Sequence, residues 1–217
     1  MAVDRVGVEL EGGWENDPSR KYHEHLKYDG SVTGVAGAYI GELASKPMKL
    51  DKILLWVNKV YPDTHNKSCG LHIHVSFHNL LDYQKLMSKE FYDYFLKRVK
   101  KWGEEKDINP NTEFWIRLKG DNRYCTTGFR PEEQKTFTDH NGPRYMQLNY
   151  AWGLYKTLEC RLFPMFQKKE LALSAIELFV NICDEYLKKI CPREHETKTN
   201  VLDDEPEMEY NEVLVVS

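Results

Sequence analysis

The ten residues from Cys69 to His78, CGLHIHVSFH, constrain the fold of this chain most, because apolar and polar side chains alternate along them without a break. Successive side chains of a β-strand point to opposite faces of its sheet, so this alternation predicts a strand. Its apolar face would pack on a core. Its other face would carry a row of polar side chains that do not belong in a hydrophobic core: His72, His74, Ser76 and His78.

Three more segments are predicted strands, over residues 6–11, 38–44 and 156–163. Their polar positions are occupied by Glu9, Glu11, Glu42, Glu159 and Arg161. The outer face of a half-exposed sheet usually mixes Thr, Lys, Ser and Glu, whereas almost every residue here can bind a metal ion or a phosphate. Any one of these strands, taken alone, is typical of a solvated face. Several in succession favour a shared site.

Clustered carboxylates repel one another. At an effective dielectric constant of about 20, two like charges 4 Å apart cost roughly 4 kcal/mol. We therefore expect cations between these side chains. Ligand sets of mixed Glu and His suit Mg²⁺ or Mn²⁺, particularly where phosphate oxygens complete the coordination shell.

The remaining pattern predicts an α+β domain over residues 1–192, followed by an acidic tail over residues 193–217. Apolar residues at helical spacing predict three helices, over residues 46–63, 82–102 and 169–190, which would cover the apolar face of the sheet. Gly12 and Gly13 are expected to end the first strand. Loops are expected over residues 15–27 and 103–143, and a loop as long as the second is typical of a lid or a binding loop.

Composition limits the class of partner. The net charge is −4 and 41% of the residues are hydrophobic, which argues against general disorder and gives no overall attraction to nucleic acid or an anionic membrane. No apolar run approaches the roughly 20 residues that a membrane-spanning helix needs. The five cysteines form no CxxC pair, as in a protein with reduced thiols. We expect a cytoplasmic protein without nucleic-acid or membrane partners.

Four motifs in the same order resemble those of the amidoligase family: GVELEGGW, YDGSV…GELASKP, CGLHIHVSF and RYMQLN…KTLECRLFP. These carboxylate–amine ligases, related to glutamine synthetase and glutamate–cysteine ligase, are encoded by both phages and bacteria. The resemblance covers roughly residues 6–164. It implies a strongly curved, mainly antiparallel sheet with helices on its convex face, and a concave face that holds ATP and two or three divalent ions.

By position, the resemblance also implies roles for individual residues. The metal ligands would be Glu9, Glu11, Glu42, His74 and Glu159. Contacts to nucleotide or phosphate would come from His72, Arg144, Asn149 and Arg161. Asp29 would orient the incoming amine or a metal-bound water, and the catalytic groups would be Asp29, Glu42 and Arg161. The roles of Arg117, Arg123 and Arg130 stay open.

The implied reaction joins a carboxylate to an amine through an acyl phosphate, with ATP and Mg²⁺ (or Mn²⁺) as cofactors. The substrates would be small molecules or peptides, and the modest length of the chain leaves room for an oligomer or a partner protein. Three alternatives stay open: a metal-dependent phosphoesterase or nuclease, a non-catalytic protein that binds a nucleotide or peptide, and a structural sheet protein with surface histidines. The acidic net charge disfavours a nucleic-acid substrate.

Overall fold

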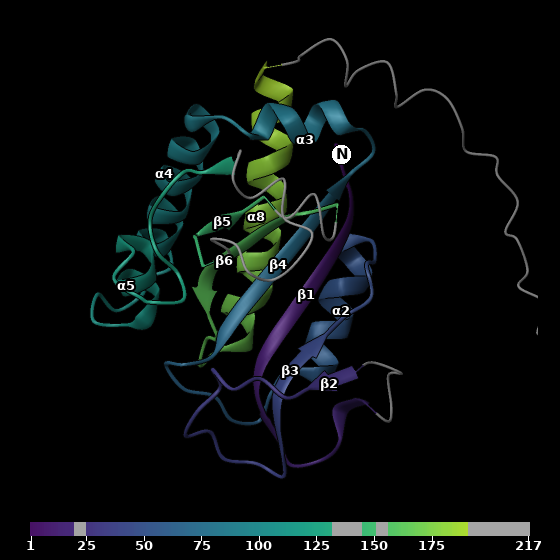
Figure 1. Cartoon of the computed structure of the whole chain (residues 1–217), viewed down its shortest axis with the longest axis vertical. Coiled ribbons are helices and arrows are strands. Elements are labelled where there is room, and N and C mark those ends of the chain that lie inside the picture. The colour runs from purple at the N-terminus through teal and green to yellow at the C-terminus, as the bar shows by residue number, and fades with distance from the viewer. Residues whose placement is uncertain (20–24, 132–144, 151–155, 191–217) are drawn as a thin grey trace, which may run out of the picture.

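Six antiparallel strands form one sheet in the order β2-β3-β1-β4-β6-β5 (Figure 1). The structure, a computed structural model, describes residues 1–19, 25–131, 145–150 and 156–190. The strands are β1 (Val3–Trp14), β2 (His25–Lys27), β3 (Tyr39–Ala44), β4 (Gly70–Phe77), β5 (Leu148–Asn149) and β6 (Leu158–Pro164). The helices of this described part are α2 (Leu50–Val60), α3 (Leu80–Leu86), α4 (Lys89–Glu105), α5 (Glu113–Lys119) and α8 (Lys169–Ile190).

The alternation predicted for β1, β4 and β6 is confirmed. Their apolar positions are buried in one hydrophobic cluster: Val6, Val8, Leu10, Leu71, Ile73, Val75, Leu158, Cys160 and Leu162. The register of the sheet also sets polar positions side by side. Glu11 of β1 lies opposite Glu42 of β3, Glu9 of β1 opposite His72 of β4, and His74 of β4 opposite Glu159 of β6. Residues far apart in the sequence therefore share one face of the sheet.

Helices cover the other face. Both α2 and α8 pack on β1, and β4 passes in front of α8 in Figure 1. α4 packs against α8, and α5 lies along β6. The buried side chains of α8 include Ile176, Phe179 and Cys183. The predicted α+β architecture, with an antiparallel sheet and a helical layer, is thus present.

The single helix predicted over residues 82–102 is wrong. Two helices, α3 and α4, occupy this stretch, and the chain leaves the helical conformation at Met87. Ser88 then caps α4, because its hydroxyl accepts a hydrogen bond from the backbone N–H of Phe91 at 3.1 Å. An N-cap serine satisfies a helical N–H that has no partner within the helix.

The expected end of the first strand at Gly12 and Gly13 is also wrong, since β1 continues to Trp14. These glycines allow close approach instead. A Cβ atom on Gly12 would lie 2.5 Å from a side-chain carbon of Pro62, and one on Gly13 would lie 2.0 Å from the carbonyl oxygen of Ala36.

Two expected loops contain regular structure. The loop expected over residues 15–27 ends in β2, which pairs with β3 at the edge of the sheet. The loop expected over residues 103–143 contains the last three residues of α4 and the whole of α5, which ends at Gly120 in the left-handed conformation. Residues 132–143 of that segment, and the predicted tail over residues 193–217, lie outside the described residues.

None of the helices in the described ranges combines the length and the hydrophobicity needed to cross a bilayer.

Candidate metal centre

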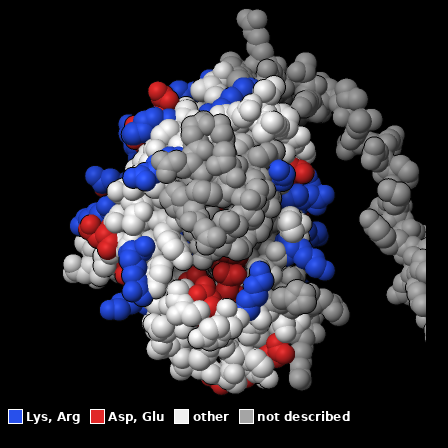
Figure 2. All heavy atoms as spheres, in the orientation of Figure 1, with Lys and Arg blue, Asp and Glu red and all other residues white. Residues whose placement is uncertain are grey.

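The polar positions of four neighbouring strands, β3, β1, β4 and β6, meet on the sheet face that α2 and α8 leave uncovered. Figure 2 shows acidic side chains gathered in a hollow of the molecular surface, with basic side chains on either side of it. Three overlapping groups of side chains that could ligate a metal ion lie in this region, and the donor atoms of each group fall within 4.8 Å of one another.

The first group is formed by Glu9, His74 and Glu159. His74 Nε2 lies 3.3 Å from Glu9 Oε1 and 3.9 Å from Glu159 Oε1. The side chains of His74 and Glu159 are only 13% and 4% exposed, so little water screens these charges. One imidazole and two carboxylates at this spacing could share a single cation.

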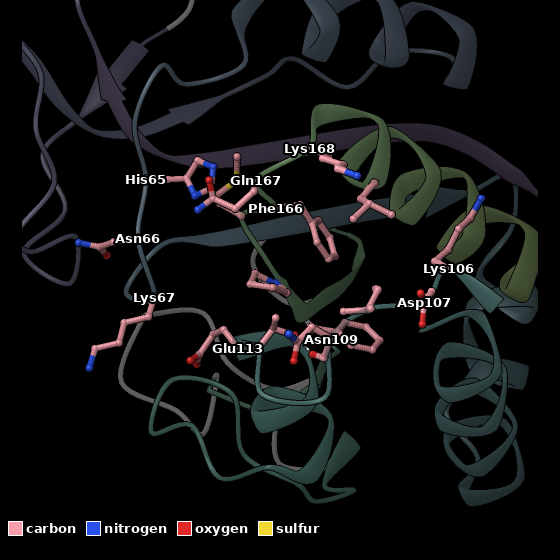
Figure 3. Close-up of a pocket in the computed structure, with 16 residues that line it drawn as sticks. His65, Asn66, Lys67, Lys106, Asp107, Asn109, Glu113, Phe166, Gln167 and Lys168 are labelled. Atoms are coloured by element: carbon pink, nitrogen blue, oxygen red, sulfur yellow. Dashed lines mark hydrogen bonds between the residues drawn. The ribbon is translucent and has the colours of Figure 1, made fainter. Parts of the chain in front are cut away.

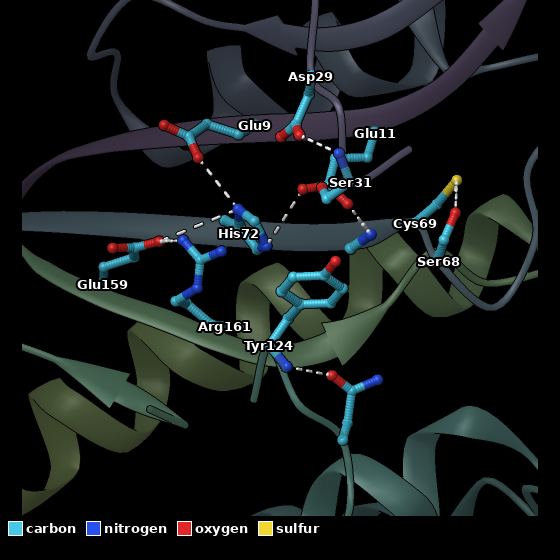
Figure 4. A network of polar contacts seen from close by, with 12 residues as sticks. Glu9, Glu11, Asp29, Ser31, Ser68, Cys69, His72, Tyr124, Glu159 and Arg161 are labelled. Carbon is cyan, nitrogen blue, oxygen red and sulfur yellow. Dashed lines mark hydrogen bonds and ion pairs between the residues drawn. The ribbon is translucent and has the colours of Figure 1, made fainter. Parts of the chain in front are cut away.

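The second group is formed by Glu9, Glu42 and His72, and the third by Glu11, Asp29 and Glu42. His72 Nδ1 donates to Glu9 Oε2 at 3.1 Å (Figure 4). Because Glu9 belongs to the first two groups and Glu42 to the last two, the groups form a continuous row. The row has room for more than one ion.

Neighbouring polar groups hold the carboxylates in place. The backbone N–H of Gly70 donates to Glu11 Oε2 at 2.5 Å. Glu159 accepts on both oxygens, from Asn149 Nδ2 at 2.7 Å and from Arg161 Nη1 at 2.6 Å. Hydrogen bonds of this kind fix the orientation of metal-ligating side chains.

Thr157 was not predicted to take part, yet its hydroxyl lies 3.2 Å from His74 Nδ1. This contact sets the plane of the ring and leaves Nε2 of His74 facing Glu9. A signal for Thr157 existed in the sequence, since it occupies a polar position two residues before Glu159 in the alternating segment.

The pKa values show that the centre has an excess of negative charge. Burial acts to lower the pKa of His74, but the carboxylates of Glu9 and Glu159 outweigh it and raise that pKa to about 9. Burial and the nearby charge of Glu9 raise the pKa of Glu42 to about 7. Protons on His74 and Glu42 thus offset part of the negative charge. A bound metal ion would compensate this charge in their place.

Two other carboxylates, those of Glu9 and Glu159, have pKa values that are lowered. Burial acts to raise the pKa of Glu9, but the imidazoles of His74 and His72 hold it well below its usual range. Burial likewise opposes ionisation of Glu159, yet the guanidinium of Arg161 lowers its pKa. Both side chains therefore stay ionised at neutral pH and fit a cation. The donors are carboxylate oxygens and imidazole nitrogens without any thiolate, a set that suits Mg²⁺ or Mn²⁺.

Next to the third group lies a small polar hollow of about 40 Å³. Its walls are formed by Glu11, Asp29, Ser31, Ser68, His72, Arg117, Tyr124, Tyr145 and Arg161. Arg117 comes from α5, is 2% exposed, and donates to backbone carbonyls of β6 and of the residue before β4, those of Arg161 and Cys69. The guanidinium of Arg161 lies 5.6 Å from the centre of the Tyr145 ring.

Arg117, Tyr124 and Tyr145 were not predicted as site residues. No periodicity marks the tyrosines. For Arg117 the available signal was its place between apolar residues of a short helical pattern closed by Gly120, which is unusual for a solvated arginine.

Nine of the ten predicted site residues lie together around the candidate metal centre and the polar hollow: Glu9, Glu11, Asp29, Glu42, His72, His74, Asn149, Glu159 and Arg161. Arg144, the tenth, lies outside the described residues. Asn149 faces Glu159, and its predicted contact with nucleotide stays a prediction. His78, at the end of the imidazole row, is instead exposed beside Asp4, 3.6 Å away.

Comparison of the chain with protein-family models, with curated proteins and with solved structures finds no match.

Proposed function

We propose that the protein is an ATP- and Mg²⁺-dependent carboxylate–amine ligase with a fold like the catalytic domain of glutamine synthetase. One observation carries the proposal: three metal-ligand groups share Glu9 and Glu42 along one row, beside the buried guanidinium of Arg161. A row of this kind suits a polyphosphate whose oxygens several cations neutralise at once. The sequence motifs that resemble amidoligases fall on this same row.

The reaction would proceed through an acyl phosphate. A carboxylate is a poor electrophile, because its leaving group would be oxide. Transfer of the γ-phosphoryl group of ATP to the carboxylate provides phosphate as the leaving group, and an amine then attacks the carbonyl carbon to form an amide or isopeptide bond. Bound Mg²⁺ or Mn²⁺ would neutralise the phosphate oxygens during the transfer.

Arg161 is suited to bind the phosphoryl group while it is transferred from ATP to the carboxylate. Burial opposes its charge, but Glu159 and Glu9 raise its pKa, so the guanidinium is cationic at any working pH. Its Nη1 donates to Glu159, while its buried Nε has no hydrogen-bond partner among the described residues. A phosphate oxygen would provide the missing acceptor.

Glu42 and Asp29 are suited to the amine. The carboxylate of Glu42 lies in the second and third ligand groups, close enough to Asp29 for both carboxylates to face one ammonium group. Asp29 shares the third ligand group with Glu42 and accepts from the backbone N–H of Ser31 at 2.7 Å. We assign to Asp29 the binding of the ammonium form and to Glu42 the removal of its proton.

The test is ADP release from ATP by the purified chain with MgCl₂ or MnCl₂ and pooled amino acids and peptides. Mass spectrometry would identify a conjugate that weighs one water less than its two components. Glu9→Gln should abolish ADP release and conjugate formation, because Glu9 belongs to two ligand groups. Glu15→Gln, at an exposed position just after β1, is the matched control and should be fully active.

Two results would contradict the proposal. ADP release that Glu9→Gln leaves unchanged would place the chemistry elsewhere. Metal-dependent cleavage of phosphodiesters or phosphomonoesters without ATP, lost in Glu9→Gln, would instead favour the phosphoesterase alternative, since two-metal hydrolases use similar ligands.

A further inference from the structure

A second cavity, of about 420 Å³, lies between the turn that follows α4, the start of α5, the end of β6 and the first turn of α8 (Figure 3). None of its lining residues belongs to the three metal-ligand groups or to the polar hollow. Its size falls within the range of about 300–1,000 Å³ that is typical of small-molecule sites.

The floor of the cavity is apolar and partly aromatic. Phe114, Met165 and Phe166 are buried there, and the centres of the two phenylalanine rings lie 6.3 Å apart. Ile108 and Leu171 extend the apolar wall. Such a surface favours a flat or aliphatic ligand body, whose burial removes apolar area from water.

The rim is predominantly cationic. Lys67, Lys106 and Lys168 line it with exposed side chains, and none of the three forms an ion pair with a described residue. Lys67 lies across the cavity from Lys106 (Figure 3). Of the two acidic lining residues, Glu113 is engaged elsewhere, because it accepts from Asn122 at 2.5 Å and lies 3.7 Å from Arg117 Nε.

That pairing leaves Asp107 as the remaining acid of the rim, against three lysines. His65 adds a further polar group. Its Nδ1 is buried and has no hydrogen-bond partner among the described residues, and burial lowers the pKa of the ring, so that it is neutral at pH 7. A neutral imidazole offers both a donor and an acceptor.

We propose that this cavity is a second binding site, for a small amphipathic anion. The apolar or aromatic body of the ligand would lie against Phe114 and Phe166, and its carboxylate, sulfonate or phosphate would lie among the lysines of the rim. The site goes beyond the proposed ligase function and does not depend on it, since it shares no residue with the metal centre.

The test uses 8-anilinonaphthalene-1-sulfonate, which combines an aromatic body with one anionic group, on the full-length folded chain. We expect saturable binding with one site per chain, measured by fluorescence titration. In amide NMR spectra the largest shifts should fall on lining residues such as Asn109, Thr112 and Gln167. N-phenyl-1-naphthylamine, which lacks the sulfonate, should bind at least about tenfold more weakly, because the lysines then have no partner.

The decisive variant combines Lys106→Glu with Lys168→Glu. It should raise the Kd for the sulfonate at least about tenfold and leave the Kd for the neutral probe nearly unchanged. The matched control combines Lys97→Glu with Lys188→Glu, two exposed positions outside the cavity that change the net charge equally. Since all four lysines are exposed, both variants should unfold cooperatively at nearly the same temperature as the parent chain.

Three outcomes would overturn the proposal: no saturable binding, amide shifts that fall away from the cavity, or an equal loss of affinity in the two double variants. Glu9→Gln should bind the sulfonate as the parent chain does, with or without EDTA. Failure of the ligase proposal and failure of this one are therefore distinguishable.

Discussion

At the scale of single residues, the candidate metal centre depends on the groups that orient its carboxylates as well as on the carboxylates themselves. Asn149 is an example. Its amide donates to one oxygen of Glu159 while Arg161 donates to the other, so the carboxylate has a fixed direction. Without Asn149 the carboxylate could rotate, and an ion would have to order it on binding.

Asn149→Ala should therefore weaken Mn²⁺ binding by about 10- to 100-fold, the usual effect of removing a partner of a metal ligand. Titration calorimetry with MnCl₂ measures this directly. Asn181→Ala, at an exposed position of α8, is the control and should leave the affinity unchanged. Equal affinities in all three proteins would show that Asn149 does not orient Glu159.

Loss of the His74 proton on metal binding gives a second prediction at this scale. Its pKa of about 9 means that the ring is protonated at pH 7.5, and an ion in the first ligand group must displace that proton. The affinity for Mn²⁺ should thus rise by up to about tenfold per pH unit from pH 7 to pH 9. Calorimetry in two buffers of different ionisation enthalpy should detect about one proton released per ion; release of none would contradict the prediction.

The same shift affects the stability of the metal-free protein. A histidine whose pKa is higher in the folded chain than in the unfolded chain stabilises the fold fully below its unfolded pKa, and this contribution disappears as the pH rises through the folded pKa. For His74 that window runs from 6.5 to about 9. Alkaline pH should therefore strengthen metal binding while it weakens the metal-free fold.

At the scale of elements, the close approach of β1 to its neighbours depends on Gly13. A Cβ there would meet the Ala36 carbonyl oxygen at 2.0 Å and the Thr64 hydroxyl at 2.7 Å, so backbone must move to admit it. Gly13→Ala should lower the free energy of unfolding by about 1–3 kcal/mol, the usual cost of overpacking.

Gly7→Ala is the matched control on the same strand. Its Cβ would meet only the Cβ of His74, at 3.7 Å, which is an ordinary van der Waals contact. Urea denaturation of the two variants compares them with the parent chain. If Gly13→Ala lowers the free energy of unfolding no more than Gly7→Ala does, the segment around Ala36 can move at little energetic cost, which would contradict the prediction.

The strands and helices show which parts of the fold can be predicted from the sequence. Alternation predicted the faces of β1, β4 and β6 correctly, because burial on one side imposes a period of two, and helical spacing located α8. The break at Ser88 escaped prediction because its neighbours keep a helical apolar spacing on both sides. The role of Gly12 and Gly13 escaped because the segments that approach them, around Ala36 and Pro62, come from elsewhere in the chain.

The same reasoning explains the prediction of the site. Ligands that sit on strands were found, because a strand position fixes the face to which a side chain points. Arg117 was not found, because its place depends on how α5 packs against β6, and its partners at Cys69 and Arg161 lie far from it in the sequence.

At the scale of the whole molecule, a metal ion bound only by the folded chain should stabilise it. At a free concentration 100 times Kd the gain is about 2.7 kcal/mol, which corresponds to a rise in Tm of about 5–10 °C for a chain of this length. Thermal unfolding with MnCl₂, reversed by EDTA, measures it. Glu9→Gln should abolish the rise and Glu15→Gln should retain it; a rise that persists in Glu9→Gln would place the ion elsewhere.

The side chains of the first candidate metal group lie at positions 9, 74 and 159, and the last of them is on β6, the last strand among the described residues. A nascent polypeptide that has emerged only as far as β5 lacks both Glu159 and the guanidinium of Arg161, so the first group is incomplete. We therefore expect an ion to bind in that group only after β6 has paired with β4, so that bound metal would stabilise the completed sheet and not its earlier partial forms.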